Sequence, residues 1–370
     1  MSKAAELANL IGNINMGGGG VGRNIVINGN FAIAQRSTSV TGITSGDTYH
    51  TVDRFMTRVT TAGTWTQTQS TDTPTGKGLS HSLKMACTTA DSSLGASDTV
   101  QIQHRIEGFN LQHLKYGTSD ALPLTISFYV KAVKTGINIV SLYMDDGNDA
   151  QSQSYTINSS NTWEFKTVRF TGNTGQAIAN DNTRSMIIQF HLASGSNFQS
   201  GTLGTSWAEQ STANEAVGQV NHADSTSNTW QIAGLQMEAG QNPTSFEHIS
   251  NFGEELARCQ RYFISQTVDS SFYSGRVISS NRIDTGVPFP VEMRATPSLA
   301  NGFNTSITGA TCNTRDGNFT DILATSFSTE ISHGTKSIGG FRITNSNISQ
   351  PAQGCCTNQL QGKVEFSAEL

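Results

Sequence analysis

The feature that most constrains this chain is a long succession of short segments in which apolar and polar residues alternate. The clearest is LPLTISFYVKAV, where Leu124, Ile126, Phe128 and Val130 occupy every second position. This period is typical of a half-buried β-strand. Similar segments recur, separated by turns rich in glycine, asparagine, serine and threonine. About eight to ten such strands predict a β-sandwich, and we expect a jelly roll.

The closing strand of this domain is predicted within SNTWQIAGLQMEAGQNPTSFEH. Trp230, Ile232 and Leu235 fall on an apolar pattern that ends at a polar break. We expect the three side chains to be buried against a first strand that carries Ile25 and Ile27. The sequence therefore predicts one jelly-roll domain over residues 24–250.

A short helix and a second β domain are predicted after this strand. In GEELARCQRYFIS, residues 253–265, Leu256, Cys259 and Phe263 share one helical face, with two glutamates in the first turn. Alternating segments then resume as far as the C-terminus. We expect a connector helix over 253–265 and a C-terminal β domain over 266–370, so that the fold class is all-β.

The first 22 residues have a different pattern. Leu7, Leu10 and Ile11 form an apolar stripe in a segment of helical period, and MGGGGVG follows it. A helix of about ten residues is marginal alone. Residues 1–22 are therefore predicted to be a docking helix with a glycine-rich hinge, and these three side chains are the candidate docking residues.

Composition excludes several classes of partner. Charged residues make up 14% of the chain, the net charge is −5, and there is no block of lysine or arginine. Nucleic-acid binding is therefore not expected. No apolar run approaches the roughly 18–20 residues of a membrane span, and the N-terminus has no cleavable apolar core, so neither membrane insertion nor a secretory signal is expected.

Cysteine usage favours a protein folded in a reducing compartment. The five cysteines are irregularly spaced and form no zinc-binding pattern. Reduced thiols are the simplest interpretation. The adjacent Cys355 and Cys356 could instead form a bridge or bind a metal, and the sequence leaves their role open.

Five segments, in order, resemble a family of bacteriophage tail-fibre and related virion proteins, which also open with MSKA. They are NIVINGNFAIAQRST, YHTVDRFMTR, WQIAGLQMEAGQNPTSFEH, EELARCQRYF and FPVEMRATPSL. The resemblance implies that the first domain is a carbohydrate-binding-like jelly roll. It also implies a homotrimer on the virion surface, made in the host cytoplasm and released by lysis. The last 70 residues or so share only the general β pattern.

What the family implies for function is attachment to the host. The expected role is a non-enzymatic tail fibre, or receptor-binding protein, that contacts host-surface glycans and joins a tail adaptor, the tail tube or the capsid through its N-terminus. Two alternatives stay open. One is a capsid decoration or head-fibre protein that coats or stabilises the shell, and the other is a polysaccharide depolymerase. Neither the position on the virion nor the glycan follows from the sequence.

Candidate glycan-binding residues are aromatic side chains in polar loops. Trp207 lies in LGTSWAEQS, and Phe272 and Tyr273 lie in DSSFYSG. An aromatic ring can stack on the apolar face of a sugar, although packing of the loop explains Trp207 equally well. Trp163 and Trp230, by contrast, begin apolar strands and are expected in the core. There is no Gly-x-Ser-x-Gly elbow and no His-Glu-x-x-His, so no catalytic residue is assigned.

No metal or other cofactor is expected. Carbohydrate-binding jelly rolls often hold calcium between the first and last strands, but here those strands offer only Asn28, Asn30 and Gly234. Calcium takes about six to eight oxygen ligands, several of them carboxylates. The acidic run MDDGNDA, residues 144–150, lacks the glutamate of a calcium loop and is interpreted as a hairpin turn.

Overall fold

A computed structural model of the chain describes residues 3, 23–248, 251–267, 271–279, 282–299, 312–313, 326–328, 336, 338–344, 355–360 and 363–370. For most strands beyond residue 266, only the backbone is described. The chain divides into two compact units, Met1–Glu255 with Leu370, and Leu256–Glu369. The predicted docking residues Leu7, Leu10 and Ile11 lie outside the described residues, so that prediction stays a prediction.

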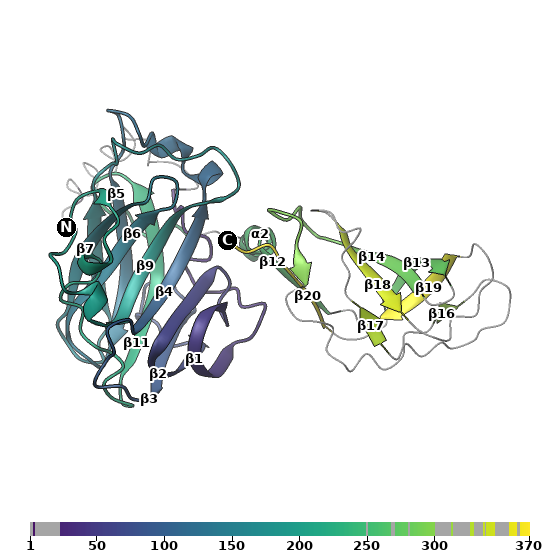
Figure 1. Ribbon diagram of the computed structural model, residues 1–370, viewed down its shortest axis with the longest axis horizontal. Coiled ribbons are helices and arrows are strands. Elements are labelled where there is room, and N and C mark those ends of the chain that lie inside the picture. Colours follow the sequence, from purple (N-terminus) through teal and green to yellow (C-terminus); the bar gives the residue numbers. More distant parts are fainter. Residues whose placement is uncertain are drawn as a thin grey trace. The chain divides into compact units, whose positions relative to one another are not determined.

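The first unit is an antiparallel β structure (Figure 1). Its strands follow the order β10-β7-β6-β9-β4-β2-β3-β11-β5-β8, and β1 pairs with β2. Short 3-10 turns interrupt the connections at Gly108–Asn110, Gln112–Leu114, Ser196–Phe198 and Thr212–Asn214. The strands are β1 (Ser39–Tyr49), β2 (Phe55–Ser70), β3 (Ser82–Thr89), β4 (Thr99–Glu107), β5 (Leu124–Ala132), β6 (Gly136–Met144), β7 (Asp149–Ile157), β8 (Glu164–Phe170), β9 (Arg184–Ser194), β10 (Ala208–Glu209) and β11 (Thr229–Ala239).

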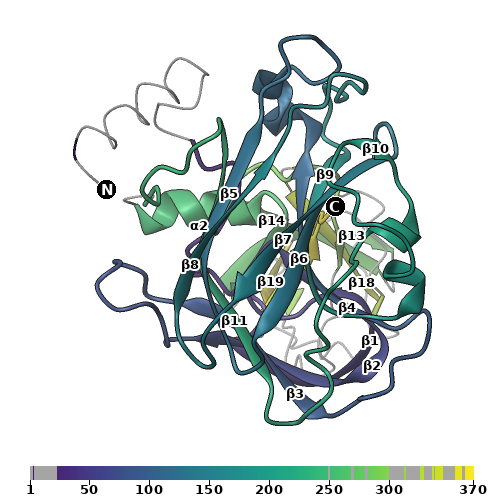
Figure 2. The same ribbon diagram turned by 90° about the vertical axis from the view of Figure 1, so that its left-hand side faces the viewer.

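Strand β2 folds this sheet into two facing layers. Its first half pairs with β4 and its second half with β3, with a break where Thr61 (φ 49°) and Gly63 (φ 73°) leave the extended conformation. The bend brings Gln67 Nε2 to 2.7 Å from Thr57 Oγ1, ten residues away. A straight strand would separate these residues by about 33 Å. One layer therefore contains β4, β9, β6, β7 and β10, and the other contains β3, β11, β5 and β8 (Figure 2).

The core lies between these layers and is rich in aromatic rings. Phe128 on β5 packs edge-to-face on Phe190 of β9, with ring centroids 5.1 Å apart, and equally close to Tyr155 of β7. Trp230 on β11 contacts Phe190 across the same space at 5.8 Å. All four residues are buried. Because each contact joins one layer to the other, these rings hold the sandwich closed.

The closing strand is as predicted. Trp230, Ile232 and Leu235 on β11 are buried, with exposed fractions of at most 1%. The mostly β character of the fold is also confirmed. The prediction that Trp163 belongs to the core is wrong, because its side chain is half-buried at the start of the edge strand β8.

The expected first strand around Ile25 and Ile27 is not a strand. This segment lies beside β11, where the Ile25 N–H donates to the Met237 carbonyl at 2.9 Å. It then turns at Asn28 (φ 62°), whose side-chain amide bonds to the Ile33 N–H and carbonyl and to the Asp53 carbonyl. Those bonds hold the chain in a turn, and a turn cannot extend a ladder.

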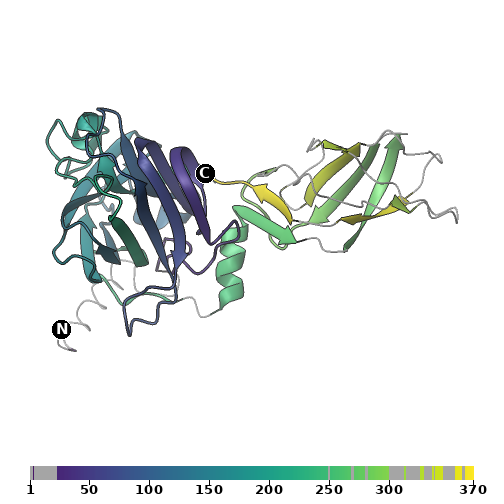
Figure 3. The same cartoon turned by 90° about the horizontal axis from the view of Figure 1, so that it is seen from below.

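The second unit begins within helix α2 (Phe252–Gln260), which is shorter than predicted. The helix was expected to continue to residue 265, but Phe263 already begins strand β12, where it pairs with Ser367. The strands form two antiparallel sheets, β12-β20-β15 and β16-β19-β13-β14-β18-β17 (Figure 3). They are β12 (Phe263–Thr267), β13 (Ser271–Ser279), β14 (Arg282–Pro288), β15 (Ser298–Leu299), β16 (Cys312–Asn313), β17 (Ser326–Ser328), β18 (Ile338–Thr344), β19 (Cys355–Leu360) and β20 (Lys363–Ser367).

A small apolar cluster stabilises the three-stranded sheet of this unit. Tyr262, Phe263 and Phe366 are fully buried, and the Phe366 ring packs edge-to-face on Phe289 at 4.8 Å. Cys87 and Cys259 are buried and form no disulfide among the described residues. Within the described parts of the chain, no helix has both the length and the apolar character needed to span a bilayer.

Candidate functional site

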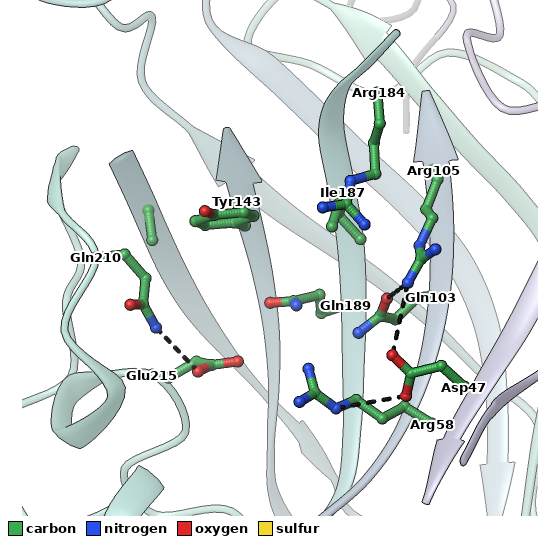
Figure 4. A pocket seen from close by; sticks show the side chains of 11 residues that line it. Asp47, Arg58, Gln103, Arg105, Tyr143, Arg184, Ile187, Gln189, Gln210 and Glu215 are labelled. Carbon is green, nitrogen blue, oxygen red and sulfur yellow. Dashed lines mark hydrogen bonds and ion pairs between the residues drawn. The ribbon is translucent and has the colours of Figure 1, made fainter. Parts of the chain in front are cut away.

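A polar groove of about 340 Å³ lies on the outer face of the layer that contains β4, β9 and β6 (Figure 4). This volume is within the range of sites that bind small ligands. Side chains from strands far apart in the sequence meet in it, and two more come from the loop that follows β9. The lining residues are Asp47, Arg58, Gln103, Arg105, Tyr143, Ala150, Arg184, Ile187, Gln189, Gln210 and Glu215.

Strand register explains why these residues meet. Directly opposite residues of an antiparallel pair share a face, so a row of partners crosses the sheet. One row joins Arg105, Ile187, Tyr143 and Ala150, from β4, β9, β6 and β7. The next row joins Gln103, Gln189 and Ser141. A third row joins Asp47, Arg58, Gln101 and His191.

The arginines of the groove face carboxylates. Asp47 lies between Arg58 and Arg105, at 3.6 Å and 3.8 Å from their nearest guanidinium nitrogens. Arg184 forms a two-pronged ion pair with Asp145 in the turn after β6. Arg105 also donates to the main-chain oxygen of Leu370 and to the side-chain oxygen of Gln103. The guanidinium groups are thus held in place, and their charge is largely balanced within the protein.

One wall of the groove is built by the long connection between β9 and β11. Glu215 anchors it, because its carbonyl accepts from Ser152 Oγ at 2.8 Å and its carboxylate accepts from Gln101 Nε2 at 3.2 Å. The Gln210 N–H donates to the Asn148 carbonyl at 2.7 Å. These bonds fix Gln210 and Glu215 at the edge of the sheet.

Burial shifts two titratable groups beneath this wall. Burial raises the pKa of the Glu215 carboxyl, although the Arg58 guanidinium and hydrogen bonds from glutamine side chains act in the opposite direction. Burial, together with the nearby Arg58 guanidinium, lowers the pKa of His191 to about 3. His191 is therefore neutral at physiological pH.

Gln189 and Tyr143 lie at the centre of the groove. Only 7% of Gln189 is exposed, yet its side-chain amide has no hydrogen-bond partner among the described residues. Tyr143 is anchored through its hydroxyl, which donates to Asn148 Oδ1 at 3.1 Å. The groove thus offers a free amide beside a fixed aromatic ring (Figure 4).

A serine and a histidine lie in contact under the groove but do not form a nucleophilic pair. Ser141 Oγ is 2.7 Å from His191 Nε2, and Gln101 Nε2 lies 3.4 Å from Nδ1. Since the amide is a donor, it assigns the ring proton to Nε2, which donates to Ser141 instead of accepting from it. Ser141 is also fully buried, so no substrate reaches its hydroxyl.

The candidate glycan-binding residue Trp207 lies in the same long connection but outside the groove lining. Its indole N–H donates to the Thr171 carbonyl at 2.6 Å, and its ring meets Tyr116 edge-on at 5.9 Å. The side chain is half-buried against the core. These contacts account for Trp207 as a loop anchor, and its contact with glycan stays a prediction.

Phe272 and Tyr273 lie on β13, where they pair with Gln359 and Asn358 of β19. The structure describes this strand by its backbone alone, so the structure does not test their predicted role. It places them in the second unit, whereas the groove belongs to the first.

The residues that were considered as calcium ligands have structural roles in a turn and in packing. The Asn28 side chain holds its own turn, and Gly234 (φ 59°) lies under Leu79, so that a Cβ there would lie 2.8 Å from Leu79 Cδ1. The acidic segment 144–150 is a hairpin turn between β6 and β7, as predicted. Among the described residues, no group of three or more possible ligands could hold a metal ion.

The sequence analysis did not identify the groove, although two strands carried a signal. In QIQHR, residues 101–105, and in QFH, residues 189–191, polar side chains recur at every second position. That pattern predicts a polar outer face on two strands. It does not show that the strands are neighbours, because β4 and β9 are nearly eighty residues apart.

Comparison with known proteins finds similarity of structure and not of sequence. No family model matches the chain, and no curated protein matches it. The enzymatically active domain of bacteriophage CBA120 tailspike protein 4 is similar over 59% of this chain and 21% of that chain, at 14% identity and a TM-score of 0.31. The chain thus matches about a fifth of the length of that tailspike.

Two carbohydrate-binding modules are similar over almost their whole length. TmCBM61, solved with β-1,4-galactotriose, covers 59% of this chain and 99% of its own at 11% identity and a TM-score of 0.28. The family 11 module from Clostridium thermocellum, solved with a mixed-linked tetrasaccharide, covers 60% and 97% at 11% identity and a TM-score of 0.25. These values mark a distant likeness of β-sandwiches and carry no argument about function.

Proposed function

We propose that the first unit binds a glycan in the groove and does not cleave it. The observation that carries this proposal is the unpartnered amide of Gln189, which lies on the groove floor between Tyr143 and the guanidinium groups. An amide that faces a groove without a protein partner bonds to water there, and a ligand that supplies both donors and acceptors can take the place of that water.

The chemistry of the lining favours sugar hydroxyls over other ligands. A hydroxyl both donates and accepts, as the amides of Gln103, Gln189 and Gln210 do. The arginines already face Asp47 and Asp145, so the groove has little unbalanced charge for a nucleic acid or an acidic peptide. Its open shape on the face of a sheet also admits a chain that continues beyond the bound residues.

The proposal of binding without cleavage rests on the carboxylates. Cleavage of a glycosidic bond uses a pair of carboxyl groups that both reach the sugar. Glu215 is mostly buried and engaged with Gln101, and Asp47 is paired with two arginines. Ser141 receives no activation from His191. Release of reducing ends from a bound polysaccharide would contradict this part of the proposal.

The wider role that we propose is a virion-surface protein that recognises host glycans, as the resemblance to tail-fibre proteins implies. Sites of this kind bind weakly, and a millimolar Kd corresponds to only about −4 kcal/mol. A homotrimer would present three grooves and raise avidity by ~10²–10⁴. Copy number per particle separates a tail fibre, with a few copies, from a shell decoration, with tens to hundreds.

The test is binding of the full chain to an array of purified bacterial surface polysaccharides. We expect Gln189→Met, which keeps the volume and removes the amide, to weaken binding by about 10-fold, or about 1.4 kcal/mol. The matched control is Gln241→Met, because Gln241 is exposed and lies outside the groove.

Equal binding by the wild type and Gln189→Met would remove the groove as the glycan site. Absence of binding to every polysaccharide on the array would contradict the proposed function as a whole. Reducing-end release is measured on the same samples, so that cleavage and binding are scored separately.

A further inference from the structure

A cluster of aromatic side chains lies on the outer face of the other layer of the first unit. Tyr129 on β5 and Phe165 on β8 are direct partners in the strand register, and their rings are 5.0 Å apart. Phe165 is 49% exposed, and Tyr129 is half-buried. Trp163 precedes Phe165 by two residues, just before β8. We call Tyr129, Trp163 and Phe165 the aromatic platform.

The platform is anchored by one carboxylate. Trp163 Nε1 donates to Asp72 Oδ1 at 3.1 Å, and Lys131 Nζ donates to Asp72 Oδ2 at 2.8 Å. Lys131 follows Tyr129 by two residues on β5 and therefore shares its face. The same carboxylate thus fixes the indole of one strand and the ammonium of its neighbour, so that Trp163 is held in place before any ligand arrives.

Tyr129 is supported from its other side. Leu79 packs over Gly234 of β11, where a Cβ would lie 2.8 Å from Leu79 Cδ1 and 3.6 Å from the Tyr129 ring. Gly234 also has a φ of +59°, so other residues are disfavoured there. The Tyr129 ring therefore lies against Phe165 on one side and close to Gly234, over which Leu79 packs, on the other.

Beside the platform lies a buried acceptor without a partner. Gln231 on β11 is opposite Lys131 in the register, and only 2% of it is exposed. Its side-chain oxygen has no hydrogen-bond partner among the described residues. An acceptor of this kind is satisfied when a ligand or a water donates to it. The aromatic rings and this unmet acceptor are independent observations, and both lie on the same face.

The size of the platform indicates the kind of ligand. An aromatic side chain contributes about 150–250 Å², so three rings offer at most ~450–750 Å², and these three are only partly exposed. A stable protein interface buries about 800 Å² on each partner. Two residues along a strand are about 6.6 Å apart, so Trp163 and Phe165 are spaced to contact neighbouring units of an oligosaccharide.

We propose that the aromatic platform is a second sugar-binding surface, distinct from the groove and suited to a neutral oligosaccharide of two or more units. The apolar faces of two pyranose rings stack on Trp163 and Phe165, a hydroxyl group reaches Lys131, and a water between the ligand and the protein donates to Gln231. Recognition depends on stacking and hydrogen bonds, because Lys131, the ammonium group beside the rings, is already paired with Asp72.

The experiment is NMR titration of the full chain with cellohexaose, a neutral oligosaccharide, with selective observation of tryptophan indole signals. We expect a saturable shift of the Trp163 signal in the wild type and at least a 5-fold weaker Kd in Phe165→Ala. The matched control is Phe109→Ala, since Phe109 is 51% exposed elsewhere on the same unit. Gln189→Met in the groove should leave the Trp163 titration unchanged.

Equal Kd values for Phe165→Ala and Phe109→Ala would overturn the proposal. So would a titration of Trp163 that is lost in the groove variant, because the effect would then come from the groove. A change of oligomeric state in Phe165→Ala, measured by light scattering, would also overturn it and show that another copy of the chain covers the rings. If the groove fails on the polysaccharide array while Trp163 still titrates, only the groove proposal is contradicted.

Discussion

The two outer faces of the first unit are made by strands of one continuous sheet, yet they differ in chemistry. The groove face combines amides, guanidinium groups and carboxylates across four or more strands, with Gln103, Gln189 and His191 nearly inaccessible. The opposite face carries Tyr129, Trp163 and Phe165 over two neighbouring strands. The difference follows from what covers each face.

The long connection between β9 and β11 folds over the groove face and buries the residues on the floor of the groove. Residues on the outer side of β9 are buried because Glu215 and its neighbours lie on them. Gln101 and Gln103 find partners within the protein there, whereas the Gln189 amide faces the groove. No comparable wall covers Phe165, so its ring stays in contact with solvent. The path of one connection thus separates hydrogen-bonding recognition from aromatic recognition.

The largest expected effect separates the interior from the platform. Trp230→Ala should lower the free energy of unfolding by ~3–5 kcal/mol, since the indole fills the space between the layers against Phe190. Trp163→Ala should cost less than about 1 kcal/mol, because the ring is only half-buried on the surface. Urea unfolding of both variants measures the difference. Equal losses would mean that Trp163 belongs to the core after all.

The next effect concerns the buried histidine beneath the groove. His191 has a pKa of about 3 in the folded protein and an ordinary pKa of 6.5 in the unfolded chain, so between these values the unfolded chain holds more protons than the folded one. Stability is therefore full above about pH 6.5 and is lost as the pH falls toward 3, by about 1.4 kcal/mol per pH unit. His191→Asn should remove this part of the slope, whatever it does to the stability at pH 7.

Glu215 acts in the opposite sense. Burial raises its pKa above the ordinary value of 4.5, so the folded protein keeps this proton at pH values where the unfolded chain has lost it. Its contribution to stability therefore falls as the pH rises through that range. Glu215→Gln should make stability increase more steeply with pH above 4.5. An unchanged slope in urea unfolding at several pH values would show that the carboxyl group is hydrated.

A smaller effect is expected at Trp207. Trp207→Ala removes the hydrogen bond to the Thr171 carbonyl and the contact with Tyr116, and we expect a loss of about 1–2 kcal/mol in stability. If the side chain only anchors its loop, affinity for a polysaccharide found on the array should change by less than about 2-fold. A loss of 10-fold or more without unfolding would restore Trp207 as a sugar contact.

The smallest expected effect is that of salt. Arg58, Arg105 and Arg184 face Asp47 and Asp145, so binding of a neutral glycan releases few counterions. Affinity should change by less than about 2-fold between 50 mM and 500 mM NaCl. A steep loss of affinity with salt would show that the groove takes an anionic chain.

Much of the sandwich was predictable from local pattern. Strands β5 and β11 show the clearest alternation, and Trp230, Ile232 and Leu235 are buried as expected. Strand β1 escaped detection because most of it is exposed and polar, with Gly42 and Gly46 at positive φ. The strand expected around Ile25 and Ile27 does not form, because Asn28 turns the chain and bonds to the Asp53 carbonyl, 25 residues away, a contact that leaves no trace in local sequence.

The candidate sites were harder to predict for a physical reason. Asp47, Arg58 and Gln189 lie on three strands, and they meet only because β2 and β9 both pair with β4. Trp163 was expected in the core because alternation does not reveal which of two faces is covered. Trp207 was predicted to contact glycan because it is an aromatic residue in a polar loop. Local sequence cannot show that its indole N–H bonds to the Thr171 carbonyl and that its ring packs against Tyr116.

The central claim is tested most directly by a crystal structure of the full chain with the oligosaccharide that binds most tightly on the polysaccharide array. The account predicts an intact sugar chain across the groove, with a hydroxyl within hydrogen-bond distance of the Gln189 amide and a pyranose ring against Tyr143. A sugar bound only outside the groove would contradict the account, and so would a cleaved chain within it.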